Sequence, residues 1–282
     1  MFVIETPYFS LDQTYLSGQI FRWIRVRAGK YVIPCKDKVL KVEQVRSRLV
    51  LSCSEKEFYD YWFDYFDLAT DYAHLNEKLK FCSEYLKVCS VRGSGIHIIK
   101  QDLFEVIISF IVSQQQSIPR IRAILDKLCA TCGLVHKQNM RECGRVVWYE
   151  FPTPEQILEN RDKLRGCKLG YREDYIVGIC ESIVDGWLDL DLLQEMCYKE
   201  AKDYLMQFDG IGPKEADCIC LYALHHMQAF PVDSHIKEVM EKEFGMDDPE
   251  AVRDWNFPEL RGYEGLVQQY MFYNEVNKSG EG

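Results

Sequence analysis

One short stretch, residues 205–218, constrains the fold of this chain more than any other. It reads Leu-Met-Gln-Phe-Asp-Gly-Ile-Gly-Pro-Lys-Glu-Ala-Asp-Cys. An amphipathic helical pattern ends at Gly210, and Pro213 suits the first position of a second helix. Between the two glycines stands one apolar residue, Ile211, which can pack inward while Gly210 and Gly212 free the backbone. The pattern predicts a helix-hairpin-helix over residues 199–226.

The predicted hairpin turn offers a site for an anion. Gly210, Ile211 and Gly212 would present successive unpaired N–H groups at a helix N-terminus, which suits a nucleic-acid backbone phosphate. The alternative is an ordinary helical hairpin whose glycines serve only its tight geometry.

Two charged residues near this turn indicate chemistry. Lys214 lies in the first turn of the second helix, where the helix dipole is expected to lower its pKa and favour the neutral, nucleophilic amine. Asp233, in Phe-Pro-Val-Asp, precedes a helical pattern and can cap it. A second interpretation keeps Asp233 ionised and directs it at a developing cation. The sequence leaves both open for Asp233.

The formal net charge of −10 over 282 residues argues at first against a nucleic-acid partner. The charges are, however, grouped in blocks. Residues 22–48 hold nine basic and two acidic side chains, and residues 161–172 hold five basic and one acidic. Fields act over roughly 8–10 Å, so the total does not exclude a basic face toward DNA.

Three other features of the sequence indicate the cellular compartment in which the protein resides. The apolar run 106–112 is too short to span a bilayer, and the N-terminus lacks a secretory pattern. The 12 cysteines are scattered, which favours reduced thiols. We therefore expect a monomeric, cytoplasmic (nucleoid-associated) protein with no membrane partner.

The chain order predicts an α+β fold. Residues 20–52 alternate in apolar and polar side chains with turns between, as in an antiparallel sheet. A helical spacing of aromatics follows over 55–66, and Arg92-Gly-Ser-Gly95 reads as a linker. We expect an N-terminal sheet domain over 1–95 and a helical region over 96–282, with single helices at 103–113, 118–132, 171–185 and 189–208.

One cysteine cluster has the spacing of a zinc site: Cys129, Cys132, His136 and Cys143. Because Cys129 lies on an apolar helix face and Gly133 ends that helix, we expect no metal there.

Several motifs together resemble the helix-hairpin-helix DNA glycosylase superfamily. The Gly-Ile-Gly-Pro-Lys turn followed by Pro-Val-Asp is specific for the superfamily. The element Ser17-Gly-Gln-Ile-Phe-Arg-Trp23 resembles the eukaryotic-type 8-oxoguanine DNA glycosylase/AP lyases, which also occur in bacteria and archaea. Residues 101–121, 169–172 and 216–221 match as well, so the resemblance covers nearly the whole chain.

The resemblance implies a role for each matching residue around the damaged base. Lys214 would attack the sugar C1′ and form a Schiff base, and Asp233 would stabilise the positive charge at that sugar. Phe272 would stack on the flipped base. Three further groups would complete the base pocket: Gln268 at the Watson–Crick edge, Cys218 on the other ring face and the Gly18 carbonyl at N7–H.

The resemblance also implies contacts to the opposite strand. Arg120 and Arg172 would donate to the estranged cytosine, and Tyr171 would wedge beside it. Gln115 stands where the family has an asparagine that fills the vacated space, within the run Gln114-Gln-Gln116. This departure leaves open how strict the preference for cytosine opposite the lesion is.

The function implied is base excision of 8-oxoguanine from duplex DNA with strand nicking by β-elimination. The alternatives are a glycosylase for another damaged purine and a non-catalytic helix-hairpin-helix DNA-binding protein. No cofactor is expected, although the hairpin could hold a monovalent cation. An iron–sulfur cluster near the C-terminus is not expected, because the last cysteine is Cys220.

Overall fold

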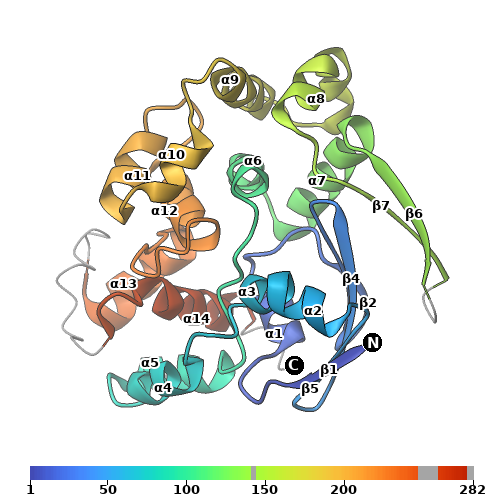
Figure 1. Cartoon of the computed structure of the whole chain (residues 1–282). Helices are drawn as coiled ribbons and strands as arrows, with labels where there is room; N and C mark the ends of the chain where they lie inside the picture. Colours follow the sequence, from blue (N-terminus) through green and yellow to red (C-terminus); the bar gives the residue numbers. More distant parts are fainter. Residues whose placement is uncertain (141–143, 247–259, 278–282) are drawn as a thin grey trace.

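The computed structural model describes residues 1–140, 144–246 and 260–277. Its N-terminal part is a five-stranded antiparallel sheet in the order β1-β5-β4-β3-β2 (Figure 1). The strands are β1 (Phe2–Glu5), β2 (Ile24–Arg27), β3 (Lys30–Cys35), β4 (Lys38–Val45) and β5 (Arg48–Leu51). The predicted antiparallel sheet is confirmed.

Two details of this sheet differ from the sequence prediction. Strand β1 was not expected, since its four residues become a strand by pairing with β5, from Phe2 opposite Leu51 to Glu5 opposite Arg48. The chain before β2, from Ile20 to Trp23, forms a buried loop instead of a strand. Four residues are too few to show in the sequence that β1 will pair with β5, which lies more than forty residues further along the chain.

Helices make up most of the remainder. In chain order they are α1 (Leu11–Leu16), α2 (Glu55–Glu57), the π-helical turn η1 (Phe58–Trp62), α3 (Phe63–Tyr65), α4 (Tyr72–Leu79), α5 (Glu84–Arg92), α6 (Leu103–Ser113), α7 (Ile118–Cys132), α8 (Pro154–Glu159), the 3-10 helix η2 (Arg161–Cys167), α9 (Arg172–Val184), α10 (Leu190–Glu195), α11 (Tyr198–Leu205), α12 (Pro213–Tyr222), α13 (Ser234–Phe244) and α14 (Glu264–Val276). The single helix predicted over 189–208 is wrong. Extended backbone at Met196 divides it into α10 and α11, and Cys197 caps the second.

A two-stranded hairpin interrupts the helical region. Strands β6 (Val135–Met140) and β7 (Gly144–Tyr149) pair antiparallel and extend from α7 as a ribbon in Figure 1. The expectation of an entirely helical region after residue 95 is therefore wrong. Val135 and Val147 are exposed, so the ribbon lacks the clear apolar face by which a strand is recognised in a sequence.

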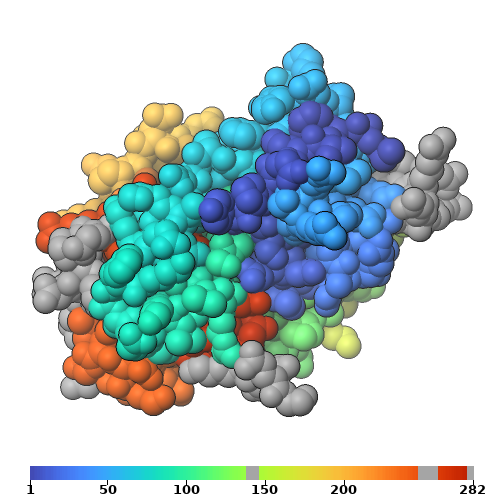
Figure 2. Space-filling view, turned by 90° about the horizontal axis from the view of Figure 1, so that it is seen from below, coloured from blue at the N-terminus to red at the C-terminus, as the bar shows by residue number. Residues whose placement is uncertain are grey.

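The hydrophobic side chains form two clusters that do not divide at residue 95. The sheet packs against η1 and α3, whereas Tyr72, Leu75 and Leu86 of α4 and α5 join the cluster of the later helices. Helix α5 packs along α14. In Figure 2 the α4–α5 segment lies beside the N-terminal sheet, and a small part of α14 shows behind it.

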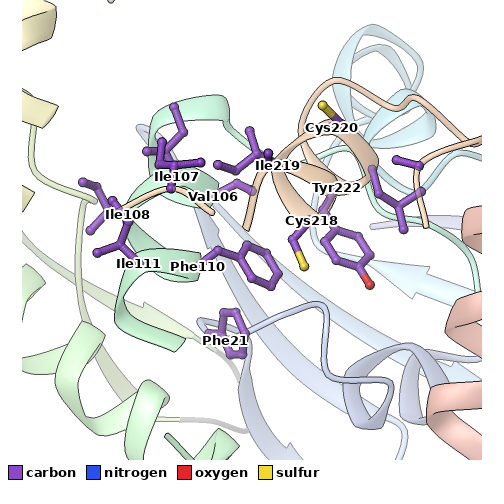
Figure 3. Packing of buried hydrophobic residues seen from close by; sticks show 14 of the residues in the cluster. Phe21, Val106, Ile107, Ile108, Phe110, Ile111, Cys218, Ile219, Cys220 and Tyr222 are labelled. Atoms are coloured by element: carbon purple, nitrogen blue, oxygen red, sulfur yellow. The ribbon is translucent and has the colours of Figure 1, made fainter. Parts of the chain in front are cut away.

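Helix α6 lies at the centre of the molecule and is buried nearly all round. It packs against α12, so the hairpin helix that carries Lys214 rests on the core (Figure 3). Within the described ranges, no helix combines the length and apolarity needed to cross a bilayer.

Candidate active site

A cavity of about 600 Å³ opens where α6, α12, α14 and the loop at residues 17–18 meet. Its volume falls in the roughly 300–1,000 Å³ range of small-molecule sites. Eight residues named from the sequence line it: Gly18, Gln115, Tyr171, Lys214, Cys218, Asp233, Gln268 and Phe272. These residues come from distant parts of the chain, and folding brings them to one place.

Lys214 lies in the first turn of α12, directly after Pro213 at the first helical position. Its Nζ donates to Ser113 Oγ at 3.2 Å and lies 5.1 Å from the centre of the Phe110 ring. Ser113 in turn donates to the Phe110 carbonyl at 2.7 Å. About 30% of the Lys214 side chain is exposed, so the amine is positioned by α6 yet open to the cavity.

Asp233 caps α13, because its Oδ1 accepts the N–H of Ile236 at 2.9 Å. It also lines the cavity. The two interpretations left open by the sequence are thus compatible: the cap fixes the carboxylate at the cavity wall.

Gly18 is in contact with the Phe272 ring. Its φ is +83°, and a Cβ at this position would come within 2.7 Å of Phe272 Cε1. Two side chains hold this loop: Gln269 donates to the Ser17 carbonyl, and Gln19 donates to Ser17 Oγ at 2.9 Å. Any other residue at 18 would push the ring aside and strain the backbone.

Gln268 and Cys218 provide the polar and neutral parts of the cavity. Gln268 is 4% exposed, and its Oε1 finds no hydrogen-bond partner among the described residues. A buried acceptor without a partner costs free energy, which a ligand that donates to it would recover. Burial raises the pKa of the Cys218 thiol to about 12, so it lines the cavity as an uncharged group.

Aromatic side chains form one wall of the cavity. Phe110 of α6 stacks on Tyr222 of α12 with ring centres 5.4 Å apart, and Phe21 meets the Phe110 edge at 5.7 Å. Figure 3 shows Cys218 and Tyr222 pointing from α12 toward the Phe110 side of this space, with Phe21 beneath.

Arg172 is buried, whereas a residue that faces the opposite DNA strand would be expected at the surface. It is 4% exposed, and its guanidinium donates to the carbonyls of Leu169, at 3.1 Å, and Gln114. These two backbone carbonyls, which no sequence pattern reveals, accept from Nη1 and Nη2, while Nε has no partner among the described residues. Direct donation to a cytosine stays a prediction and would require Arg172 to leave these partners.

The turn between α6 and α7 is tied to the hairpin. Gln114 Nε2 donates to the Gly210 carbonyl at 2.7 Å. Gln115 is exposed with φ at +51°, a conformation that asparagine adopts more readily than glutamine. Arg120 and Tyr171 are both exposed, and their roles stay predictions.

The hairpin turn does not present a row of unpaired N–H groups. Ile211 N–H donates to the Phe208 carbonyl at 3.1 Å, and Gly212 N–H donates to Glu215 Oε2 at 3.2 Å. That part of the sequence interpretation is wrong for these two groups, because a reverse turn and a capping carboxylate use them. Gly210, with φ at +89°, packs directly on the ring of Tyr175.

The basic block 22–48 does not form a free basic face. At least six of its nine bases form ion pairs. Arg22 is buried against Glu105 at 2.9 Å, and Lys30 is buried against Glu43 at 3.2 Å. Several of the acidic partners lie far away in the chain, so a local charge count could not include them.

No group of three metal-binding side chains occurs in the part of the chain that the structure describes. His136 contacts Glu150 and stacks on Trp148 at 5.0 Å, and burial raises the pKa of Cys129 to about 12. Cys143, the fourth member of the zinc pattern, lies outside the described residues.

The sequence did not single out the polar residues Ser113, Glu215 and Gln269, nor the aromatic residues Phe110 and Tyr222 that line the cavity. Ser113 and Gln269 act through tertiary contacts that leave no local signal. Glu215 carries one, since an acid three positions after Gly212 has the spacing of a capping box.

Comparison with known proteins places the chain in a family. Residues 1–107 match the 8-oxoguanine DNA glycosylase N-terminal domain, and residues 108–255 match the HhH-GPD superfamily of base excision DNA repair proteins. The second match covers more than half of the chain. The chain therefore belongs to the HhH-GPD superfamily of base excision DNA repair proteins. Its N-terminal domain is of the 8-oxoguanine DNA glycosylase type, which confirms the predicted resemblance and fold class.

Three relatives illustrate this likeness. The 8-oxoguanine glycosylase/lyase of Clostridium acetobutylicum, in complex with double-stranded DNA containing cytosine opposite 8-oxoguanine, is 29% identical with a TM-score of 0.89, covering 99% of both chains. A probable N-glycosylase/DNA lyase of Methanothermobacter thermautotrophicus is 28% identical over 96% of this chain and 95% of its own length. The N-glycosylase/DNA lyase of Saccharomyces cerevisiae is 30% identical over 64% of this chain, a match that spans 50% of the yeast protein.

Proposed function

We propose that the protein excises 8-oxoguanine from duplex DNA through a Schiff base on Lys214 and then nicks the strand by β-elimination. One observation carries the proposal: Lys214, Asp233, Gly18, Gln268 and Phe272 line a single cavity. A DNA-binding module without catalysis has no need for an amine and a carboxylate on the wall of a base-sized cavity.

The cavity supports a role for each residue in recognising the flipped base. The base would stack on Phe272, with the neutral Cys218 thiol on its other face. The unpartnered Gln268 Oε1 would accept from the Watson–Crick edge. The Gly18 carbonyl would accept N7–H, which 8-oxoguanine has and guanine lacks, so that guanine would meet it lone pair to lone pair.

The chemistry then follows in two steps. The Lys214 nitrogen attacks C1′ with its lone pair, the C1′–N9 bond breaks, and the electron pair of that bond leaves with the base, while the Asp233 carboxylate stabilises the cationic sugar. The C1′–O4′ bond then breaks as a proton moves from the amine nitrogen to O4′, which opens the sugar ring and leaves the protonated Schiff base. Loss of a proton from C2′ then expels the 3′ phosphate oxygen, which cuts the strand.

The remaining contacts would serve the rest of the duplex. Gln115 would fill the vacated space, Tyr171 would wedge beside the estranged base, and Arg120 and Arg172 would contact it. The hairpin at 210–212 would receive a backbone phosphate. We infer that the protein acts as a monomer on DNA inside the cell, without a required cofactor.

Excision assays test this proposal directly. Duplexes carrying 8-oxoguanine opposite each of the four bases are compared with an undamaged duplex and with one carrying hypoxanthine. We expect base release and strand scission on the 8-oxoguanine duplexes, undiminished by EDTA. Preferential release of hypoxanthine would favour the other-purine alternative, and tight binding without release would favour the non-catalytic one.

A further inference from the structure

Glu215 lies next to the candidate nucleophile and has no assigned role in the reaction. Its Oε2 accepts the Gly212 N–H at 3.2 Å, and its Oε1 lies 4.0 Å from Lys214 Nζ. The side chain is 13% exposed and lines the cavity. One carboxylate thus bonds to the hairpin turn and also lies close to the amine of Lys214.

The carboxylate uses a donor that a DNA phosphate would use. A carboxylate oxygen and a phosphate oxygen are both anionic acceptors that form short hydrogen bonds to backbone N–H groups at helix N-termini. The two cannot accept from the same Gly212 N–H in the same direction, and their negative charges repel each other at close range.

We propose that Glu215 occupies the phosphate position of the hairpin in the DNA-free protein and competes with the DNA backbone for it. The inference rests on the proposed function. Glu215 is thus a positioning residue that weakens binding to undamaged DNA, because every encounter must displace its carboxylate. The base pocket, rather than the hairpin, then carries more of the discrimination between damaged and undamaged sites.

Two measurable consequences follow from this competition. Removing the negative charge strengthens binding to undamaged duplex about tenfold, which equals about 1.4 kcal/mol. It also makes the salt dependence steeper by up to about one unit of slope, because the protein then presents one negative charge fewer beside the DNA phosphates.

The test is Glu215→Gln, which keeps an oxygen acceptor for the Gly212 N–H and loses the charge. Affinity for an undamaged duplex is measured by fluorescence anisotropy across a salt titration, with KM and the single-turnover rate on 8-oxoguanine DNA. The matched control is Glu200→Gln. Glu200 Oε2 accepts the Cys197 N–H at 3.0 Å in the same kind of cap, at the end of α11 away from the turn.

Tighter binding, a steeper salt slope and a lower KM for Glu215→Gln, with no change for Glu200→Gln, support the proposal. Unchanged or weaker binding overturns it. Should Glu215→Gln unfold, Glu215→Ala is measured instead, with the same expectation for affinity. Failure of the proposed function is distinct: the wild-type protein would then release no 8-oxoguanine, whatever its affinity for undamaged DNA.

Discussion

Substituting Gly18 by alanine should separate base recognition from strand cleavage. The new Cβ would lie 2.7 Å from Phe272 Cε1, whereas ordinary carbon contacts begin near 3.4 Å. The Phe272 ring, which lines the same cavity, must therefore shift away from residue 18 by about 0.7 Å or more. A misplacement of about 1 Å at a reacting centre can cost on the order of 100-fold in rate. At φ +83° the alanine also costs roughly 1–2 kcal/mol of stability.

The assay compares two substrates for Gly18→Ala. Excision of 8-oxoguanine should fall about 100-fold, while cleavage at a preformed abasic site should stay near wild type because no base has to enter the cavity. Gly186→Ala is the control, since Gly186 has φ +77° with nothing within 4 Å of its Cβ position. It should lose similar stability and keep full excision. Wild-type excision by Gly18→Ala would refute the reasoning.

Three other substitutions test separate parts of the structure. Gln268→Leu removes a buried acceptor that lacks a partner, so urea unfolding should show a stability within about 1 kcal/mol of wild type or higher. The rate at which this variant excises 8-oxoguanine should fall roughly 10–100-fold. A wild-type rate would contradict the role of Gln268 in recognising the base. Gln115→Asn suits φ +51° better and should raise stability by up to about 1 kcal/mol, with a stronger preference for cytosine in four-base excision assays; an unchanged preference would count against a void-filling role. Burial raises the pKa of Asp67, but the hydrogen bond and charge of His225, together with hydrogen bonds from Tyr72 and Thr70, outweigh burial and lower the pKa from 3.8 to about 2. The ionised Asp67 therefore contributes about 2 kcal/mol to the free energy of unfolding above pH 4, and this contribution is lost as the pH falls toward 2. In Asp67→Asn the free energy of unfolding should therefore depend less on pH over this range. An identical acid limb in both proteins would contradict this.

Features governed by local rules could be predicted from the sequence. The hairpin follows from two glycines and a proline at fixed spacing, and the Asp233 cap follows from an acid before a helical pattern. The antiparallel sheet follows from alternation and turns. The convergence of Lys214 and Asp233 on one cavity was implied by the family resemblance and is present in the structure.

Features that depend on tertiary partners could not be predicted. Arg172 carries the same charge whether it faces solvent or the carbonyls of Gln114 and Leu169, and only folding decides between them. The charge count of the block 22–48 favours a DNA-facing surface, but folding places acids such as Glu105 beside its bases. Likewise, α4 and α5 precede the predicted linker, yet their apolar faces pack with the later helices.

The pairing of charges also refines what the net charge of −10 means for DNA binding. With at least six bases of the block 22–48 already in ion pairs, fewer are left for phosphates. The competing Glu215 carboxylate acts in the same direction. We expect modest affinity for undamaged DNA and a shallow salt slope, with recognition resting mainly on the base pocket.

Borohydride trapping tests the central claim most directly, because it captures the Schiff base itself. The protein is incubated with a duplex containing 8-oxoguanine opposite cytosine, in the presence of sodium borohydride, and the covalent adduct is quantified on a denaturing gel. We predict an adduct for the wild-type protein and none for Lys214→Gln. Release of 8-oxoguanine by the wild-type protein without any adduct, or an adduct that persists in Lys214→Gln, would contradict the role assigned to Lys214.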